Sequence, residues 1–393
     1  MKDDHGDMNF PMEAEEPLEG KRARLRSVVA NLPTIRLCRS TLQDAENLTK
    51  GVFWPLTGFC TEEEVETILS QMRLPDGAPW PIPIVLSTSR KVADSLEVGG
   101  RVLLADATGT PYLLLHLREK YAWHRRRYAA AIYGTTDERH PGVAEVFHGM
   151  GDILLAGPVE RLSPLPHPLA RHLRSPAEIR EEIAKRRFRT VVAFQTRNVP
   201  HLGHEHLQKT ALGLFDGLLI HPLVGRKKVG DFQDHLILEA YEVLIRHYFQ
   251  HRNVILAALP TAMRYAGPRE AVFHALIRKN YGCTHIVIGR DHAGVGGFYP
   301  PEAAIEIFET FDDLGITPLF IRGDFFHCKG CRRIESDRTC PHEEAERIPF
   351  SGTRIRTLIS EGRVPEPEIM RPEIYRLITA TPHPFITDRQ DER

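Results

Sequence analysis

Residues 190–205 read TVVAFQTRNVPHLGHE, and this stretch decides the fold prediction. The apolar run Thr190–Gln195 predicts a short buried strand, and the pattern of Gly203–Phe215 predicts a helix. A polar segment with the arrangement H-x-G-H joins the two. Because strand and helix follow one another so closely, the stretch is typical of the units that build parallel α/β sheets.

The same alternation continues on both sides of this stretch. Further strands are predicted at Gly217–Val224, Val254–Leu259, Thr284–Gly289 and Ile316–Ile321. Further helices are predicted at Pro176–Arg187, Gln233–Phe249, Arg269–Tyr281 and Pro301–Leu314. We therefore expect an α/β protein whose doubly wound, Rossmann-like parallel sheet binds its ligands at the carboxyl ends of the strands.

The N-terminal half has a different texture. Short apolar runs are cut there by glycine and proline, as at Pro83–Leu86, Val102–Leu104 and Tyr112–Leu115. These runs predict a β-rich domain with few helices, one of them at Thr61–Met72, and a proline-rich linker follows at 162–176. The predicted division is a flexible lead-in at 1–25, a β-rich domain at 26–170, the parallel-sheet domain at 171–325 and a C-terminal region at 326–393.

The composition argues against several classes of protein. Lysine and arginine together number 51 and aspartate and glutamate 52, so the net charge of −1 offers no broad surface for nucleic acid. The stretch YAWHRRRY at 121–128 is therefore interpreted as a basic helix face. No apolar run approaches the ~18 residues of a membrane helix. The N-terminal residues lack the apolar segment of a secretory signal, so we expect a cytoplasmic protein without a membrane partner.

The segment 195–205 carries the groups that anion chemistry needs. Gly203 permits the backbone to approach a phosphate, and the start of the helix offers free N–H donors and the positive end of its dipole. His201 and His204 can donate hydrogen bonds to phosphate oxygens, and Arg197 can clamp an oxyanion with two nitrogens. The alternative is a pair of ordinary surface histidines, but the polar residues just upstream favour the anion site.

Two later segments have related chemistry. Residues 289–294 read GRDHAG after a predicted strand, where Arg290 can neutralise charge and the backbone N–H groups can form an anion-binding nest. Residues 351–356 read SGTRIR before a helical run, and hydroxyl groups at a helix start serve as caps or as phosphate ligands. The alternatives are a glycine-rich turn with a surface ion pair and a plain capping motif.

Together, the three segments resemble the signature segments of the ATP sulfurylase (sulfate adenylyltransferase) family, in the same order. The N-terminal half shows the resemblance too, in PLTGF at 55–59, WPIP at 80–83, YGTTD at 133–137 and HPGV at 140–143. The resemblance covers residues 35–375, nearly the whole chain. One departure is Val199, which stands where the family has a proline directly after the asparagine.

The resemblance implies a PUA-like N-terminal domain, a nucleotidylyltransferase domain and the joining of sulfate to the AMP part of ATP, with release of pyrophosphate. It places catalytic roles on Thr196, Arg197, Asn198, His201, His204 and Arg290. It places ATP contacts on Gln195, Thr196, Arg197, Asn198, His201, His204, Gly289, Arg290, Asp291 and His292. It places sulfate contacts on Gln195, Arg197 and Ala293. Mg²⁺ accompanies ATP, and a homo-oligomer, such as a dimer, is expected.

A cysteine cluster lies beyond the predicted sheet. Cys328, Cys331 and Cys340 with His342 offer three thiolates and an imidazole, a set that suits a closed tetrahedral Zn²⁺ site. His327 is an alternative fourth ligand, and three free cysteines are the alternative to a metal site. The resemblance to zinc-containing bacterial and archaeal members of the family supports zinc. We expect a structural metal that pins the chain leading into the SGTRIR segment.

Two other functions fit parts of this pattern. One is an adenylyltransferase for another acceptor, such as a carboxylate or a nucleotide phosphate; the other is a non-catalytic regulatory descendant. The QTRN segment together with Ala293 favours a small tetrahedral oxyanion over the first of these. The sequence contains no G-x-x-x-x-G-K-[ST] motif, so we expect no APS-kinase domain and a reaction that stops at adenylyl sulfate. The same residues serve the forward and the reverse reaction.

Overall fold

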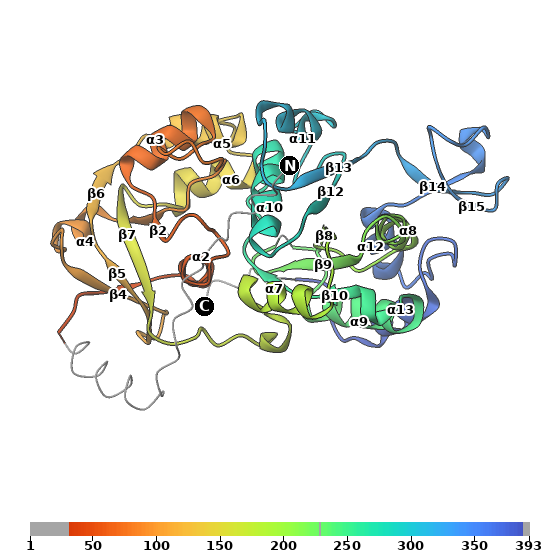
Figure 1. Cartoon of the computed structure of the whole chain (residues 1–393), viewed down its shortest axis with the longest axis horizontal. Helices are drawn as coiled ribbons and strands as arrows, with labels where there is room; N and C mark the ends of the chain where they lie inside the picture. Colours follow the sequence, from red (N-terminus) through yellow and green to blue (C-terminus); the bar gives the residue numbers. More distant parts are fainter. Residues whose placement is uncertain (1–30, 228, 388–393) are drawn as a thin grey trace.

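The computed structural model describes residues 31–227 and 229–387, and the lead-in predicted at 1–25 lies outside them. A β-rich N-terminal domain lies beside a parallel-sheet domain, and a small antiparallel sheet extends from the far side of the latter (Figure 1). Every helix in the described ranges is too short or too polar to cross a membrane.

The N-terminal domain contains, within the described residues, a seven-stranded sheet of order β1-β4-β5-β7-β2, in which β3 and β6 also pair with β7. All of its strand pairs are antiparallel except β1 with β4. The strands are β1 (Thr34–Arg36), β2 (Gly58–Phe59), β3 (Leu86–Thr88), β4 (Arg101–Ala105), β5 (Pro111–His116), β6 (Glu119–Ala122) and β7 (Ile153–Arg161). The helices are α2 (Arg39–Thr49), α3 (Glu62–Gln71), α4 (Arg90–Asp94), α5 (Arg125–Tyr133) and α6 (Pro141–Ala144).

The β-rich prediction is thereby confirmed, although one strand is shifted. The run predicted as a strand at Pro83–Leu86 enters the sheet only at Leu86. Proline has no N–H group to donate to a neighbouring strand. Pro81 and Pro83 therefore disfavour sheet pairing in the segment before Leu86. The predicted helix at Thr61–Met72 is present as α3, which begins after a capping box formed by Thr61 and Glu64.

The second domain has the predicted parallel sheet, of order β10-β9-β8-β12-β13 with β11 beside β9. Its strands are β8 (Val191–Thr196), β9 (Gly217–Val224), β10 (Val254–Leu256), β11 (Leu259–Pro260), β12 (His285–Gly289) and β13 (Thr317–Ile321). Its helices are α7 (Pro176–Lys185), α8 (Leu202–Leu212), α9 (Asp234–Tyr248), α10 (Gly267–Asn280) and α11 (Ala303–Glu306). The strand order reverses between β8 and β12, and ligands bind at such a switch point in open α/β sheets.

The predicted helix at Pro301–Leu314 is wrong in length. Only α11 and the 3₁₀ turn Ile307–Thr310 form there. The carboxylate of Asp313 accepts a hydrogen bond of 2.6 Å from the backbone N–H of Gly315, and such side-chain turns compete with helix formation. The predicted strand Val254–Leu259 is likewise divided, into β10 and β11.

The parallel sheet is covered on both faces because successive side chains of a strand point to opposite sides. Val192 and Phe194 of β8 pack into a core with α9 and the C-terminal helices. Val191 and Ala193 face the other way, into a core that continues into the N-terminal domain. There, Phe273 of α10 contacts Phe53 and Trp80 of the N-terminal domain, with ring centroids 5.5 and 5.6 Å apart.

The C-terminal region begins with a sheet that the sequence did not predict. Its antiparallel order is β15-β14-β16. The elements are β14 (Phe325–Cys328), β15 (Arg333–Ser336), β16 (Arg347–Pro349), α12 (Gly352–Ser360) and α13 (Pro372–Ala380). Helix α13 packs on α9, beside the parallel sheet (Figure 1).

Candidate active site

Two of the three predicted segments meet at the switch point of the sheet. β8 ends at Thr196 and β12 ends at Gly289, and these two parallel strands are direct neighbours. The polar segments that follow them therefore lie at the same edge. Gln195, the last residue but one of β8, is half-buried and lies opposite His221 of β9.

Side-chain hydrogen bonds fix the turn after β8. The Oγ1 atom of buried Thr196 accepts a hydrogen bond of 3.2 Å from the backbone N–H of Asn198. The Asn198 side-chain oxygen in turn accepts one of 3.1 Å from Arg356, which also lies 3.6 Å from the buried carboxylate of Asp231. Arg356 belongs to the SGTRIR segment, whose Ser351 caps α12. The third predicted segment is thus brought to the first.

The two histidines of H-x-G-H stack on one another. His201 is the N-cap of α8, and its Nδ1 atom accepts a hydrogen bond of 3.2 Å from the backbone N–H of His204. In the neutral ring the proton is therefore on Nε2, which is free to donate. The ring centroids of His201 and His204 are 3.7 Å apart, and the ring of Phe350 lies parallel to that of His201, with centroids 5.5 Å apart.

Phe350 is a site residue that sequence reasoning missed. A Cβ atom on Gly203 would lie 2.8 Å from the Phe350 ring and 3.1 Å from the His201 ring. The absent side chain at Gly203 therefore makes room for this stack. The only sequence signal for Phe350 was its place directly before Ser351.

Burial controls the charge of both imidazoles. It lowers the pKa of His204 to about 4, against a hydrogen bond to the Val199 carbonyl that acts in the opposite direction. Burial and the neighbouring His204 also hold the pKa of His201 well below its usual value. Both rings are consequently neutral at neutral pH, and each carries a single N–H; that of His201 is free, whereas that of His204 faces the Val199 carbonyl.

Arg197 has the clearest mark of a ligand site. Its Nη1 atom is buried and has no hydrogen-bond partner among the described residues. The guanidinium lies 5.2 Å from the ring centroid of Tyr265, a cation–π contact that holds it in place. A buried donor that lacks a partner costs about 1–3 kcal/mol, so the structure retains an unused donor where an anion would satisfy it.

The GRDHAG loop has an unusual backbone. Asp291 and Ala293 both have positive φ, 55° and 58°, and the N–H of Asp291 donates to the Pro301 carbonyl at 2.9 Å. A Cβ atom on Gly294 would lie 1.8 Å from the Asp291 carboxylate, so a larger residue there would displace that side chain. Burial raises the pKa of Asp291, against the charges of Arg197 and Arg290.

The other two side chains of this loop have protein partners. Arg290 lies 2.8 Å from the carboxylate of Asp324, which precedes β14. The Nε2 atom of His292 lies 3.0 Å from Nδ1 of His274 on α10. Asp324 and His274 are thus two further residues that sequence reasoning did not select.

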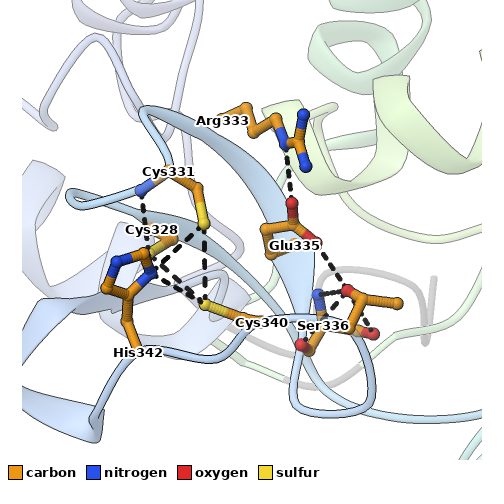
Figure 2. A network of polar contacts seen from close by, with 8 residues as sticks. Cys328, Cys331, Arg333, Glu335, Ser336, Cys340 and His342 are labelled. Carbon is orange, nitrogen blue, oxygen red and sulfur yellow. Dashed lines mark hydrogen bonds and ion pairs between the residues drawn. The ribbon is translucent and has the colours of Figure 1, made fainter.

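The predicted metal ligands form a compact group (Figure 2). The donor atoms of Cys328, Cys331, Cys340 and His342 all lie within 4.8 Å of one another. Two of the Sγ–Sγ distances are 3.4 and 3.9 Å, and the three distances from Sγ to Nδ1 of His342 are 3.3, 3.5 and 3.7 Å. A tetrahedral zinc with Zn–S of ~2.3 Å and Zn–N of ~2.0 Å requires about 3.8 and 3.5 Å, so the four atoms fit one ion.

The surroundings of the cluster support the same ligand set. The backbone N–H of Cys331 donates to Sγ of Cys328 at 3.3 Å and helps to lower the pKa of that thiol to about 7, which favours the thiolate that binds metals. A Cβ atom on Gly330 would lie 2.7 Å from the His342 ring, so glycine is needed beside the fourth ligand. His327 is on the opposite face of β14 from Cys328, and the grouping of four contains His342 instead.

Comparison with known proteins decides the family. A model of the ATP-sulfurylase family matches residues 171–381, which is more than half of the chain. The chain belongs to the ATP-sulfurylase family. A model of the PUA-like domain matches residues 12–164. Both the family and the PUA-like N-terminal domain are therefore as the sequence predicted.

The relatives of this ATP-sulfurylase family chain match it almost end to end. The sulfate adenylyltransferase of Hyperthermus butylicus is 44% identical, over 93% of this chain and 93% of that protein. The sulfate adenylyltransferase of Aeropyrum pernix is 45% identical, over 94% and 96%. That of Symbiobacterium thermophilum is 45% identical, over 93% and 91%.

One solved structure shares the fold. It is described as a hexameric APS kinase from Thiobacillus denitrificans, and it superimposes with a TM-score of 0.71 at 23% sequence identity. The match covers 93% of this chain and 66% of that chain. At this identity the likeness concerns the fold alone.

Contacts on two sides connect the small sheet that carries the Cys/His cluster to the histidines and to Arg290 of the candidate site. β16 pairs with β14 and leads directly to Phe350, which stacks on His201. Asp324, directly before β14, forms an ion pair with Arg290. The backbone N–H of Asp324 also donates a hydrogen bond of 3.0 Å to the carboxylate of Asp337, which follows β15. The small sheet therefore positions parts of the candidate site from two sides.

Proposed function

We propose that this chain is a sulfate adenylyltransferase, which converts ATP and sulfate into adenylyl sulfate and pyrophosphate. The observation that carries the proposal is the Nη1 atom of Arg197 at the carboxyl end of β8, which is buried and has no hydrogen-bond partner within the part of the chain that the structure describes. It is a fixed cationic donor in the same segment as the neutral Nε2–H donor of His201, which is what a site for anions requires. The naming of the relatives as sulfate adenylyltransferases identifies the anions.

Each segment then has a role in one displacement. Gln195, Arg197 and the N–H of Ala293 hold sulfate, whose oxygen attacks the α-phosphorus of ATP. A new S–O–P link forms, and the bond to the β-phosphate oxygen breaks with its electron pair going to pyrophosphate. His201 and His204 face the departing pyrophosphate, and Nε2 of His201 donates to it. The nucleotide lies along Thr196, Asn198 and the residues Gly289, Arg290, Asp291 and His292.

Positioning and charge compensation supply the rate in this scheme, because sulfate is already ionised and needs no general base. Mg²⁺ accompanies ATP and neutralises phosphate charge. Arg290 contacts Asp324 through its Nη2 atom, and the guanidinium has further N–H donors for phosphate oxygens.

We assign zinc to the Cys/His cluster as a structural ion, because four protein donors close the tetrahedron and leave no position for a substrate. The ion supplies cross-linking of the β14–β16 sheet and no catalytic chemistry. We also propose that the chain divides into domains at 26–170, 171–325 and 326–393. The protein acts in a reducing cytoplasm as a homodimer, and light scattering would measure the mass of the dimer.

The deciding experiment is ATP formation from adenylyl sulfate, pyrophosphate and Mg²⁺, followed by luminescence. Arg197→Ala should lower the rate by at least ~100-fold without lowering the melting temperature, because its Nη1 atom has no hydrogen-bond partner to lose among the described residues. Arg189→Ala is the matched control, since that side chain is 91% exposed. Near-normal turnover by Arg197→Ala would contradict the oxyanion role.

A folded, zinc-loaded wild-type protein that makes no ATP would overturn the proposal. Molybdate separates sulfate from other acceptors in the forward direction, because it mimics a small tetrahedral oxyanion. Molybdate-dependent cleavage of ATP to AMP is expected, and it should be lost in Arg197→Ala.

A further inference from the structure

Helix α10 carries a buried polar stripe that the proposed reaction does not use. Glu270, His274 and Arg278 follow one another at four-residue spacing, so they lie on one face of the helix. All three are 0% exposed. The helix lies between the N-terminal domain and the parallel sheet, where it is surrounded by protein (Figure 1). Titratable groups are costly at such a position unless they have partners.

The stripe begins with an ionised carboxylate. One Glu270 oxygen accepts a hydrogen bond of 2.9 Å from the N–H of Arg264, and the other accepts one of 3.0 Å from the N–H of Ala266. Burial acts to raise the pKa of Glu270, but contacts with His274 and Arg264 lower it overall. The oxygen bonded to Arg264 also lies 3.5 Å from Nε2 of His274.

The carboxylate determines where His274 keeps its proton. An ionised carboxylate has only acceptors, so the proton of a neutral His274 is on Nε2, facing Glu270. Burial holds the pKa of His274 below its usual value, against the contact with Glu270 that raises it, and the positive charge of Arg278 lowers it further. The Nδ1 atom of His274 is therefore a bare acceptor.

That acceptor faces the GRDHAG loop. Nδ1 of His274 lies 3.0 Å from Nε2 of His292, and one proton must lie between the two nitrogens. Since Nδ1 of His274 carries no proton, His292 donates the hydrogen bond from its Nε2 atom. Burial and the charges of Arg278 and Arg197 also keep the pKa of His292 well below its usual value, so the ring carries no second proton.

We propose that Glu270 and His274 are positioning residues that hold His292 in its Nε2–H tautomer, so that His292 offers Nδ1 to the nucleotide as a hydrogen-bond acceptor. This inference rests on the proposed function. Phosphate oxygens at neutral pH offer no proton to an acceptor, so its partner on the nucleotide is a ribose hydroxyl or the adenine amino group. In this geometry His292 recognises the nucleoside and not the phosphates.

Two substitutions at one position separate positioning from packing. In His274→Asn the side-chain oxygen takes the place of Nδ1 and keeps the acceptor for His292. In His274→Leu the volume is similar and the acceptor is gone. In the reverse assay we expect His274→Leu to raise KM for adenylyl sulfate about tenfold, the worth of one neutral hydrogen bond, with KM for pyrophosphate unchanged. His274→Asn should recover most of this loss.

Nucleotide analogues identify the donor that His292 accepts. In the forward assay with sulfate, 2′-deoxy-ATP, 3′-deoxy-ATP and inosine triphosphate each lack one of the three candidate donors. The wild-type protein should discriminate against one of them, and His274→Leu should lose that discrimination. If His274→Leu discriminates against all three analogues as strongly as the wild-type protein does, His292 reads none of these groups and the proposal is wrong.

A spectrum of the substrate-free protein tests the tautomer without any activity. Long-range ¹H–¹⁵N correlations of protein with ¹⁵N-labelled histidine distinguish protonated from bare ring nitrogens, and His292→Asn assigns the signal. A proton on Nδ1 of His292 would overturn the inference, and so would a folded His274→Leu with unaltered KM for adenylyl sulfate. If His274→Leu does not fold, this spectrum decides. A wild-type protein with the expected tautomer and no ATP formation would instead overturn the proposed function.

Discussion

The missing side chain of Gly203 determines how the aromatic rings of the candidate site pack. The hydrogen that replaces its side chain leaves room for Phe350 to stack on His201, and His201 in turn stacks on His204. The sequence favoured this glycine for close approach to a phosphate. The structure adds a second requirement, which is the packing of an aromatic ring from a distant segment.

Gly203→Ala should therefore lower activity while α8 still forms. The new Cβ atom would lie 2.8 Å from Phe350 and must displace the ring that orients His201. Small displacements of a catalytic donor cost ~10- to 100-fold in rate, and we expect a loss of that size in the luminescent assay. Gly213→Ala is the control at the end of the same helix, because its nearest neighbour is a carbonyl oxygen at 3.3 Å. Equal activities for the two variants would contradict the role of the stack.

The neutral histidines predict a pH dependence of stability. In the unfolded chain His204 takes up a proton below a pH of ~6.5, whereas in the folded protein its pKa is about 4. Between these values the unfolded state binds the extra proton, so the free energy of unfolding falls as the pH falls, by at most about 1.4 kcal/mol per pH unit. Urea denaturation at pH 7 and pH 5 should show a smaller loss for His204→Asn than for the wild type. An equal loss would show that His204 is not held neutral.

At the level of elements, the small sheet β14–β16 is the part of the domain that a metal can hold together. Its three short strands enclose little apolar surface, and its small core consists of Phe326 with the cluster cysteines. Figure 2 shows the four donors together, with Cys328 at the end of β14, and Glu335 and Ser336 of β15 hydrogen-bonded to Thr339 in the loop that follows. Such a sheet depends on its cross-link.

Removal of the metal should therefore lower both stability and activity. We expect about one zinc per chain by elemental analysis, and Cys340→Ser or a strong chelator should lower the melting temperature. Activity should fall as well, because Phe350 and Asp324 lose their fixed positions beside His201 and Arg290. Cys38→Ser is the control, since that thiol is exposed. A protein free of metal with unchanged melting temperature and rate would refute the cluster.

The elements also show where prediction from the sequence was sufficient. The strands β8 and β9 and the helices α8 and α9 lie within a residue or a few of their predicted bounds, because their patterns are long and regular. The pattern failed at Pro301–Leu314, where α11 and a 3₁₀ turn end at Thr310 and a side-chain turn at Asp313 follows. It also missed the β14–β16 sheet, whose strands of three or four residues are too short to show a period.

On the scale of the whole molecule, α10 joins the two large domains. Arg269 donates to the carbonyl groups of Ile68, Leu69 and Pro81, each at 3.0 Å. Asn280, at the other end of the helix, donates to those of Val52 and Trp54 at 3.0 and 2.8 Å. Because the same helix carries His274, the N-terminal domain supports the candidate site through it.

Arg269→Ala should separate the unfolding of the two domains. The substitution leaves three carbonyl groups without their donor, and we expect a loss of about 3 kcal/mol in the free energy of unfolding. Calorimetry should show one transition for the wild type and two for the variant. Arg252→Ala serves as the control, since Arg252 is exposed. A single unshifted transition in Arg269→Ala would mean that these hydrogen bonds do not couple the domains.

The sequence by itself determined the parallel sheet, the order of the three polar segments and the three cysteines of the metal cluster. These features are local: a period of hydrophobicity or a spacing such as C-x2-C is complete within a few residues. Only the tertiary structure decided the contacts of Phe350 with His201, Asp324 with Arg290, Arg356 with Asn198 and His274 with His292. Those partners come from different elements, and packing of the whole chain is what brings them within contact distance.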